Sequence, residues 1–187
     1  YEADTCLHNP MARNSLGALP TLASVAIGEI CARTLFEFGE AAAESVRAKQ
    51  NSLALDKVVE ANTLLSGLGF ESGGLALAHA IAGGYPEIKI VHDNYLHGEM
   101  VAMGVMAQLA MQNSPDRERV ARFFARVGLP IHLNQLSISA PNRDDIDKVI
   151  KLALSRPIAK NMPMPVTHAT VKEAILNGDK LLSLIHI

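Results

Sequence analysis

The chain has 187 residues, 49% of them hydrophobic and 19% charged, with a formal net charge of −2 at pH 7, so it is long enough for a sizeable folded core. Balanced charges, 4% aromatic residues and the lack of tryptophan argue against a nucleic-acid partner. Cys6 and Cys31 stand in no metal or redox spacing, and no uncharged apolar run reaches about 18 residues, so we expect a protein of the reducing cytoplasm with no membrane partner.

Apolar residues recur at spacings of three and four along most of the chain, and strict alternation is nearly missing. This pattern predicts packed helices rather than a sheet, so we expect an all-α helical bundle. Prolines mark several boundaries, because proline is tolerated in a first helical turn and restricts the residue before it. The predicted helices span residues 22–49, 54–66, 74–81, 98–113, 117–127, 143–155 and 168–182, and residues 83–96 are expected to form a loop.

We expect both ends of the chain to be cut rather than natural. We expect residues 1–181 to form one helical domain and residues 182–187 to be a non-native tail. The tail, LSLIHI, matches the translation of an adapter that is common in sequencing libraries. Tyr1 begins in the middle of a pattern, so we also expect further coding sequence upstream.

Residues 67–85, GLGFESGGLALAHAIAGGY, contain six of the thirteen glycines and a single histidine, His79. A dinucleotide-binding loop would need a strand before the glycines, whereas the helical pattern DKVVEANTLL precedes them. His79 could instead be a buried core histidine or a metal ligand. No side chain three or four positions away on its own helix can bond the ring, so a partner must come from elsewhere.

A second histidine, His97, stands where a helix is expected to begin after a loop, in the sequence His97-Gly98-Glu99. Gly98 allows close approach to the backbone, and the free N–H groups of a first helical turn favour negative charge. Glu99 therefore has a purely structural interpretation, as a carboxylate stabilised by the helix dipole. The separation of eighteen residues from His79 is not a ligand signature by itself.

The run NTLLSGLGFESGGLALAHAI, followed by a loop and HGEMVAMG, closely resembles the glycerol dehydrogenase branch of the metal-dependent, so-called iron-containing alcohol dehydrogenase family. The segments YEADTC, EICARTLFEFG, VGLPIHLNQL and NMP follow in the order expected for that family. The resemblance extends to about Lys180. It covers only the C-terminal helical domain of the dehydroquinate synthase-like fold, and the N-terminal Rossmann-like domain is missing.

The resemblance implies that His79 and His97 are two of three protein ligands to a catalytic Zn²⁺ or Fe²⁺. The third family ligand is an aspartate that would lie just upstream of Tyr1. Phe70 matches a family position that packs against the substrate. His92 and Asp93 stand at offsets that differ from those of relatives, and their role is left open.

The activity that the resemblance implies is the NAD-dependent oxidation of glycerol or a similar small vicinal diol. NAD would be bound mainly by the missing domain, and the full enzyme would form a homo-oligomer. Glycines 67, 69, 73 and 74 would let the pocket wall approach the nicotinamide and the substrate. This chain would supply metal ligands and one wall of the pocket, and would be inactive alone.

Two other functions remain as alternatives. A dehydroquinate synthase-like lyase would also use NAD and zinc, but it needs many cations around a phosphate-bearing substrate, and residues 67–104 contain only Lys89. A non-catalytic helical module, with both histidines in the core, is the second alternative.

Overall fold

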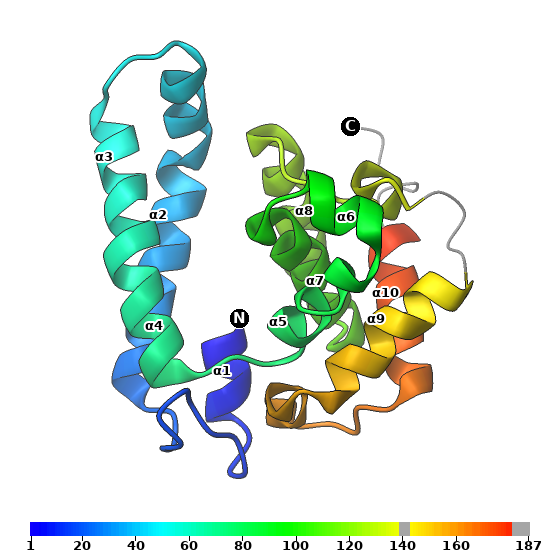
Figure 1. Cartoon of the computed structure of the whole chain (residues 1–187). Coiled ribbons are helices and arrows are strands. Elements are labelled where there is room, and N and C mark those ends of the chain that lie inside the picture. Colours follow the sequence, from blue (N-terminus) through cyan, green and yellow to red (C-terminus); the bar gives the residue numbers. More distant parts are fainter. Residues whose placement is uncertain (139–142, 181–187) are drawn as a thin grey trace. The chain divides into compact units, whose positions relative to one another are not determined.

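The computed structural model of the chain describes residues 1–138 and 143–180. These residues are helical with no strand, which confirms the all-α prediction (Figure 1). The proposed tail at 182–187 lies outside the described residues. The chain divides into two compact units, an N-terminal unit, Tyr1–Leu75, and a second unit, Ala76–Ile187.

The N-terminal unit is a helical hairpin with a short helix at its base. In Figure 1 the long helix α2 runs side by side with a second helical arm that returns in the opposite direction. The arm is continuous but changes its winding, because a π-helical turn, η1, joins α3 to α4. The bounds are α1 (Glu2–Leu7), α2 (Leu22–Arg47), α3 (Leu53–Glu60), η1 (Ala61–Leu65) and α4 (Ser66–Gly73).

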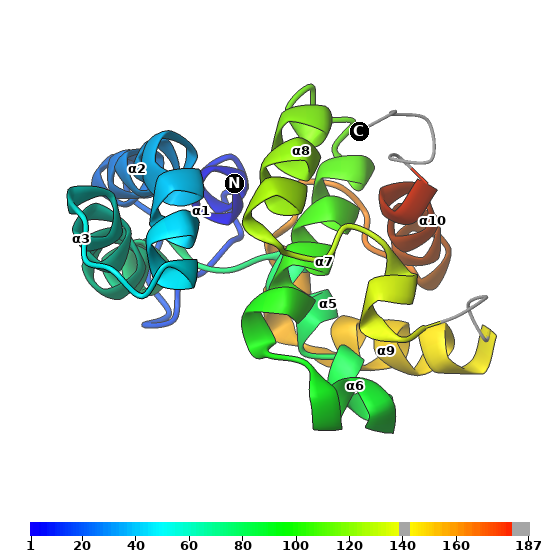
Figure 2. The same cartoon turned by 90° about the horizontal axis from the view of Figure 1, so that it is seen from above.

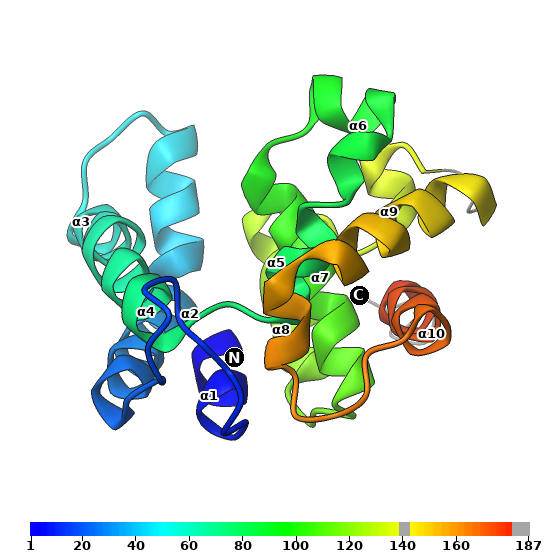
Figure 3. The same cartoon turned by 60° about the horizontal axis from the view of Figure 1, so that its bottom comes forward.

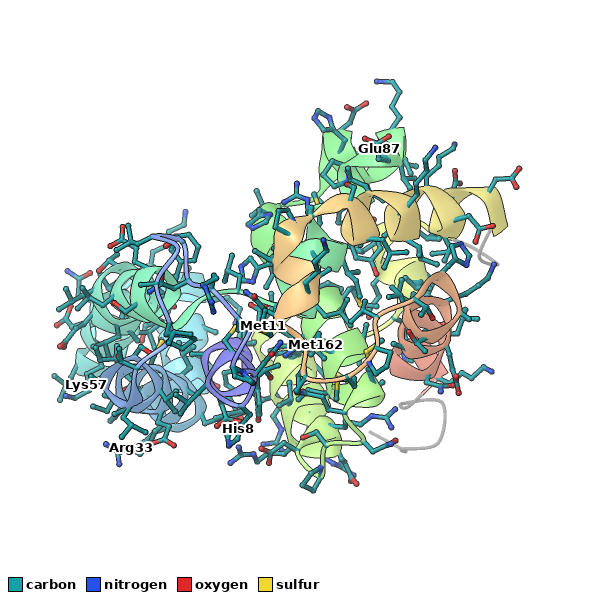
Figure 4. The ribbon with its side chains drawn as sticks, turned by 90° about the horizontal axis from the view of Figure 1, so that it is seen from below. His8, Met11, Arg33, Lys57, Glu87 and Met162 are labelled. Carbon is teal, nitrogen blue, oxygen red and sulfur yellow. The ribbon has the colours of Figure 1, made fainter. Side chains whose placement is uncertain are left out.

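Local side chains start both arms of this hairpin. The Thr21 hydroxyl accepts a hydrogen bond from the Ser24 N–H, and the Ser52 hydroxyl accepts one from the Leu55 N–H. Such caps satisfy amide groups that have no partner within the helix. Between the arms, the Lys57 ammonium lies 5.6 Å from the centre of the Phe38 ring, whereas Arg33 points away from the hairpin partner (Figure 4).

The glycine-rich stretch does not break the second arm, contrary to the prediction that this helix ends at residue 66. Helix α4 continues to Gly73, and Gly74, with a φ of 88°, ends it. A Cβ atom on Gly73 would lie 2.6 Å from Ala3 Cβ, and Gly69 lies against Gly28 of α2. Close helix packing therefore outweighs the weak helix propensity of glycine. These two glycines serve packing inside the unit.

The second unit is built around α7, which contacts α5, α8 and α10 (Figures 2 and 3). Residues 83–96, predicted as a loop, contain a 3₁₀ turn and a short helix. The bounds are α5 (Leu77–Ala82), η2 (Tyr85–Glu87), α6 (Lys89–Asn94), α7 (His97–Met111), α8 (Arg117–Val127), η3 (Leu133–Leu136), α9 (Arg143–Ser155), η4 (Pro157–Asn161) and α10 (His168–Lys180).

The large side chains of the core lie in this second unit. Helix α7, HGEMVAMGVMAQLAM, is apolar on most sides, which is the composition of a helix surrounded by others. Met103, Met106 and Leu109 of α7 and Leu77 and Ile81 of α5 are all fully buried, and the two helices pack against each other. The core thus holds α5 and α7, the two helices that carry His79 and His97, firmly together.

Over the described residues, no single helix is long and apolar enough to cross a membrane. The stretches Leu53–Gly73 and Leu77–Glu87 reach such a length and composition only when they are taken together across a break.

Candidate metal centre

Helix α5 places His79 at the edge of the core. Its sequence is LAHAIA, and the residues around His79, Leu77, Ala78, Ala80 and Ile81, are completely buried. His79 itself is only half-buried, which disfavours the alternative of a histidine enclosed in the core. The five apolar residues of α5 are buried, whereas the third residue, His79, is on the side toward solvent.

His97 is the first residue of α7 and is exposed. Its ring centre lies 5.9 Å from that of His79, and the two ring planes are tilted by 50°. The structure therefore brings together the two histidines that lie eighteen residues apart in sequence. Because α5 and α7 pack directly against each other, the pair rests on the core rather than on mobile loops.

The separation of the rings fits the geometry of one shared cation. With zinc–nitrogen bonds of roughly 2.1 Å and a tetrahedral angle, two coordinated imidazole centres stand about 5.3 Å apart. The observed centroid distance of 5.9 Å is close to this separation. Among residues 1–138 and 143–180, no group of three histidine, cysteine, aspartate or glutamate side chains could hold a metal. The ring separation is compatible with two imidazole ligands of one cation.

The two carboxylates nearest to His97 in sequence have other partners. Glu99 accepts a hydrogen bond from the Leu96 N–H at 2.7 Å, so its structural interpretation as a first-turn carboxylate of α7 holds. Asp93 on α6 accepts hydrogen bonds from Lys89 and pairs with the His92 ring. The Lys89 bond, followed by the His92 bond, lowers the pKa of Asp93. His92 and Asp93 thus form a surface cluster with Lys89.

The surroundings of His97 favour its neutral form. Partial burial, followed by the positive charges of His79 and Arg156, lowers the pKa of His97 from its ordinary value of 6.5. A metal-binding imidazole must be deprotonated at the nitrogen that coordinates, so a lowered pKa favours coordination at neutral pH.

Arg156 is a neighbour of the pair that the sequence did not reveal. Its guanidinium lies against Gly83, at the end of α5, where a Cβ atom would come within 2.3 Å of Arg156 Cζ. The residue stands between α9 and η4, more than fifty positions from either histidine. Only the packing of these elements against α5 could have identified it.

Phe70 belongs to α4 of the N-terminal unit and is 43% exposed. Its side chain is accessible, but the two histidines lie in the other compact unit. Its contact with a substrate stays a prediction.

The remaining histidines make ordinary structural contacts. His8, which follows α1 (Figure 4), lies with Nδ1 2.8 Å from the Asp4 carbonyl oxygen. His132 makes a similar contact with the Asp179 carbonyl oxygen, and His168 pairs with the Asp147 carboxylate.

No protein-family model matches the chain, whereas relatives and solved structures do. The glycerol dehydrogenase of Thermotoga maritima is 42% identical over 96% of this chain, and the glycolaldehyde reductase of Halobacterium salinarum is 37% identical over 97%; the match covers 50% of each. A probable glycerol dehydrogenase from Sinorhizobium meliloti has a similar crystal structure, with a TM-score of 0.92 and 35% identity, over 99% of this chain and 52% of that one.

The chain spans about half the length of the relatives that it matches. The agreement covers nearly all of this chain in both sequence and fold, which confirms the resemblance carried by the glycine-rich run and the HGE segment. The part that it matches is the C-terminal helical domain. In sequence and in fold, the chain corresponds to the C-terminal half of glycerol dehydrogenases.

Proposed function

We propose that this chain supplies the metal-binding part of an NAD-dependent oxidoreductase that converts glycerol, or a similar small vicinal diol, into the hydroxyketone. The names of the relatives support this substrate class, since they include glycerol dehydrogenases and a glycolaldehyde reductase. We infer that NAD is held mainly by sequence outside this chain, that the enzyme forms a homo-oligomer in the cytoplasm, and that the chain alone does not turn over.

His79 and His97 would hold Zn²⁺ or Fe²⁺ through one ring nitrogen each. Both ions accept imidazole ligands, so the ligand types admit either. When bound, such a cation supplies Lewis-acid polarisation, which lowers the pKa of an alcohol hydroxyl. The two neutral imidazoles leave the net positive charge of the cation in place, and their anchoring on α5 and α7 fixes where the hydroxyl must bind. Hydride transfer itself is the chemistry of the nicotinamide.

A single observation carries this proposal: the rings of His79 and His97 lie 5.9 Å apart at the surface of a rigid helix pair. The lowered pKa of His97 adds to it, because the ring is then available to a cation at neutral pH. Phe70 would contribute an apolar wall for the carbon side of the diol, and we expect Phe70→Ala to raise KM without changing metal affinity in the enzyme that contains this sequence.

Zinc binding to the chain tests the proposal directly. We expect weak binding, measured by competition with a chromophoric chelator at neutral pH, because the described part of the chain offers two ligands, His79 and His97, at the proposed site. Bound zinc should also raise the unfolding temperature, since a ligand of the folded state stabilises it. His79→Ala and His97→Ala should each abolish both effects.

His92→Ala is the matched control, because His92 is an exposed histidine on the neighbouring helix α6. It should bind zinc as the unaltered chain does. Retention of zinc binding in both His79→Ala and His97→Ala would contradict the proposed site.

A further inference from the structure

Helix α5 cannot cap its own first turn. Its N-cap residue, Ala76, has no side chain that accepts a hydrogen bond, and the six residues of the helix offer only His79 as a polar group. The amide groups of a first turn nevertheless need partners when they are buried. The Ala78 N–H finds one on another helix: it donates to Gln108 Oε1 of α7 at 2.8 Å.

Gln108 is only 1% exposed, and this hydrogen bond is fully buried. One helical turn before it on α7, Gly104 lies against the Ala78 carbonyl, so closely that a Cβ atom there would come within 2.1 Å of the carbonyl oxygen. The backbone of Ala78 is therefore held at its N–H by Gln108 and approached at its C=O by Gly104. Ala78 is the residue directly before His79.

The same face of α7 carries His97. Gly104 and Gln108 follow His97 by seven and eleven residues, and at 100° per residue these positions fall within roughly 20° of it around the helix axis. One face of α7 thus carries His97 together with Gly104 and Gln108. The contacts of Gly104 and Gln108 hold the backbone of Ala78, the residue before His79. The axial and rotational position of α5 on this face of α7 determines how the two rings face each other.

We propose that Gln108 is a positioning residue. By accepting a hydrogen bond from the first turn of α5, this residue of α7 fixes how the rings of His79 and His97 face each other. The structural part of this inference stands on the buried hydrogen bond, and its catalytic meaning rests on the proposed function. A methionine would fill a similar volume at this position, so apolar packing alone does not require a glutamine there.

The structural part is tested without metal by NMR on the chain. Gln108→Met removes the acceptor and keeps the volume, whereas Gln108→Glu keeps an acceptor oxygen. We expect Gln108→Met to lose hydrogen-exchange protection at the Ala78 amide and the nuclear Overhauser contact between the rings of His79 and His97. Gln108→Glu should retain both. If Gln108→Met does not fold, Gln108→Asn, which retracts the acceptor by about one bond length, provides the same comparison.

Gln135 offers a matched control in the same unit. Its Oε1 accepts the N–H groups of Ile131 and His132 at the start of η3, so Gln135→Met also removes a glutamine cap. It should leave the Ala78 amide and the ring contact unchanged. Unaltered Ala78 protection and an unaltered ring contact in Gln108→Met would overturn the inference.

Metal affinity tests the catalytic meaning. Removing residues that orient metal ligands typically weakens metal binding by about 10- to 100-fold, and for this indirect contact we expect about tenfold for Gln108→Met, partial recovery in Gln108→Glu and no change in Gln135→Met. Unchanged zinc affinity in Gln108→Met, in a chain that binds through the histidine pair, would overturn the positioning role. Unchanged affinity in His97→Ala would instead refute the proposed metal site, and the NMR comparison would still decide whether Gln108 positions the rings.

Discussion

Each of the two compact units is stabilised internally by a different kind of contact. Among the described residues, the largest fully buried side chains lie in the second unit, with Leu77, Ile81 and Met103 among them. The N-terminal hairpin instead buries small residues such as Gly39, Ala42 and Ala61, and it exposes large ones along both arms. The second unit therefore depends on apolar volume, whereas the hairpin depends on close backbone approach and helix caps. Both candidate metal ligands lie in the unit with the larger side chains.

Leu77→Ala provides the largest test of this difference. Leu77 is completely buried in the second unit, and its truncation should lower the free energy of unfolding by about 2–5 kcal/mol through lost burial and a cavity. Leu68→Ala in α4 should cost less than about 1 kcal/mol, because Leu68 is 43% exposed. Urea unfolding followed by circular dichroism measures both. Equal losses would contradict the contrast between the units.

Substituting one helical glycine in each unit with alanine should change stability in opposite directions. A methyl group on Gly104 would collide with the Ala78 carbonyl, so Gly104→Ala should destabilise the second unit by about 1–3 kcal/mol. Gly67 in the hairpin has nothing within 4 Å of the position that a Cβ would take. Gly67→Ala should therefore stabilise its helix by about 0.5–1 kcal/mol. Opposite shifts of the urea midpoint are expected, and shifts of the same sign would sink this interpretation.

Helix caps differ between the units as well. Ser52 caps its own helix in the hairpin, so Ser52→Ala should cost about 1 kcal/mol, whereas Ser52→Asp, which keeps an acceptor oxygen, should recover most of it. Thermal unfolding would measure both variants. A Ser52→Ala chain as stable as the original would show that the hairpin does not depend on this local cap.

The smallest expected effect is the pH dependence of the second unit. The pKa of His97 is lowered on folding, so the unfolded chain takes up this proton first, and stability is lost as the pH falls through 6.5 toward the lower folded value. His97→Ala should remove this part of the decline in unfolding temperature between pH 7.5 and 5.5. Arg156→Met should reduce it, because one cause of the lowered pKa is gone. His8→Ala serves as the control, and the same slope in His97→Ala would count against the effect.

The sequence predicted those elements whose signals are local. Helices 117–127 and 143–155 have the predicted bounds, because their amphipathic patterns are bordered by residues that disfavour helix, such as Pro115 and Gly128. Helix α4 escaped prediction because Gly69 and Gly73 find their packing partners on α2 and α1, far away in sequence. Propensity alone could not reveal that compensation.

The candidate site shows the same division. His79 and His97 were identified through a family resemblance, and the structure brings their rings together. Arg156 reaches the pair only through tertiary packing and carries no signal in the sequence. Gln108, in contrast, has a signal in the sequence. It is the polar residue within the apolar run VAMGVMAQLAM, and it lies eleven positions after His97 on the same face of the helix. His79 is half-buried because α5 packs its other side against the core. The pattern LAHAIA does not specify which side of the helix that is.

The π-helical turn Ala61–Leu65 determines where the second hairpin arm can change its length. Such a turn accommodates one residue more than an α-helix would, and each residue of a helix corresponds to about 100° of rotation. Deleting a single residue of the turn, such as the exposed Asn62, would restore regular winding and leave Gly69 facing α2, whereas a deletion in the α-helical part of the arm would swing the surface of α4 by that angle. In natural variation of this arm, single-residue gaps should therefore fall within Ala61–Leu65 rather than in α3 or α4.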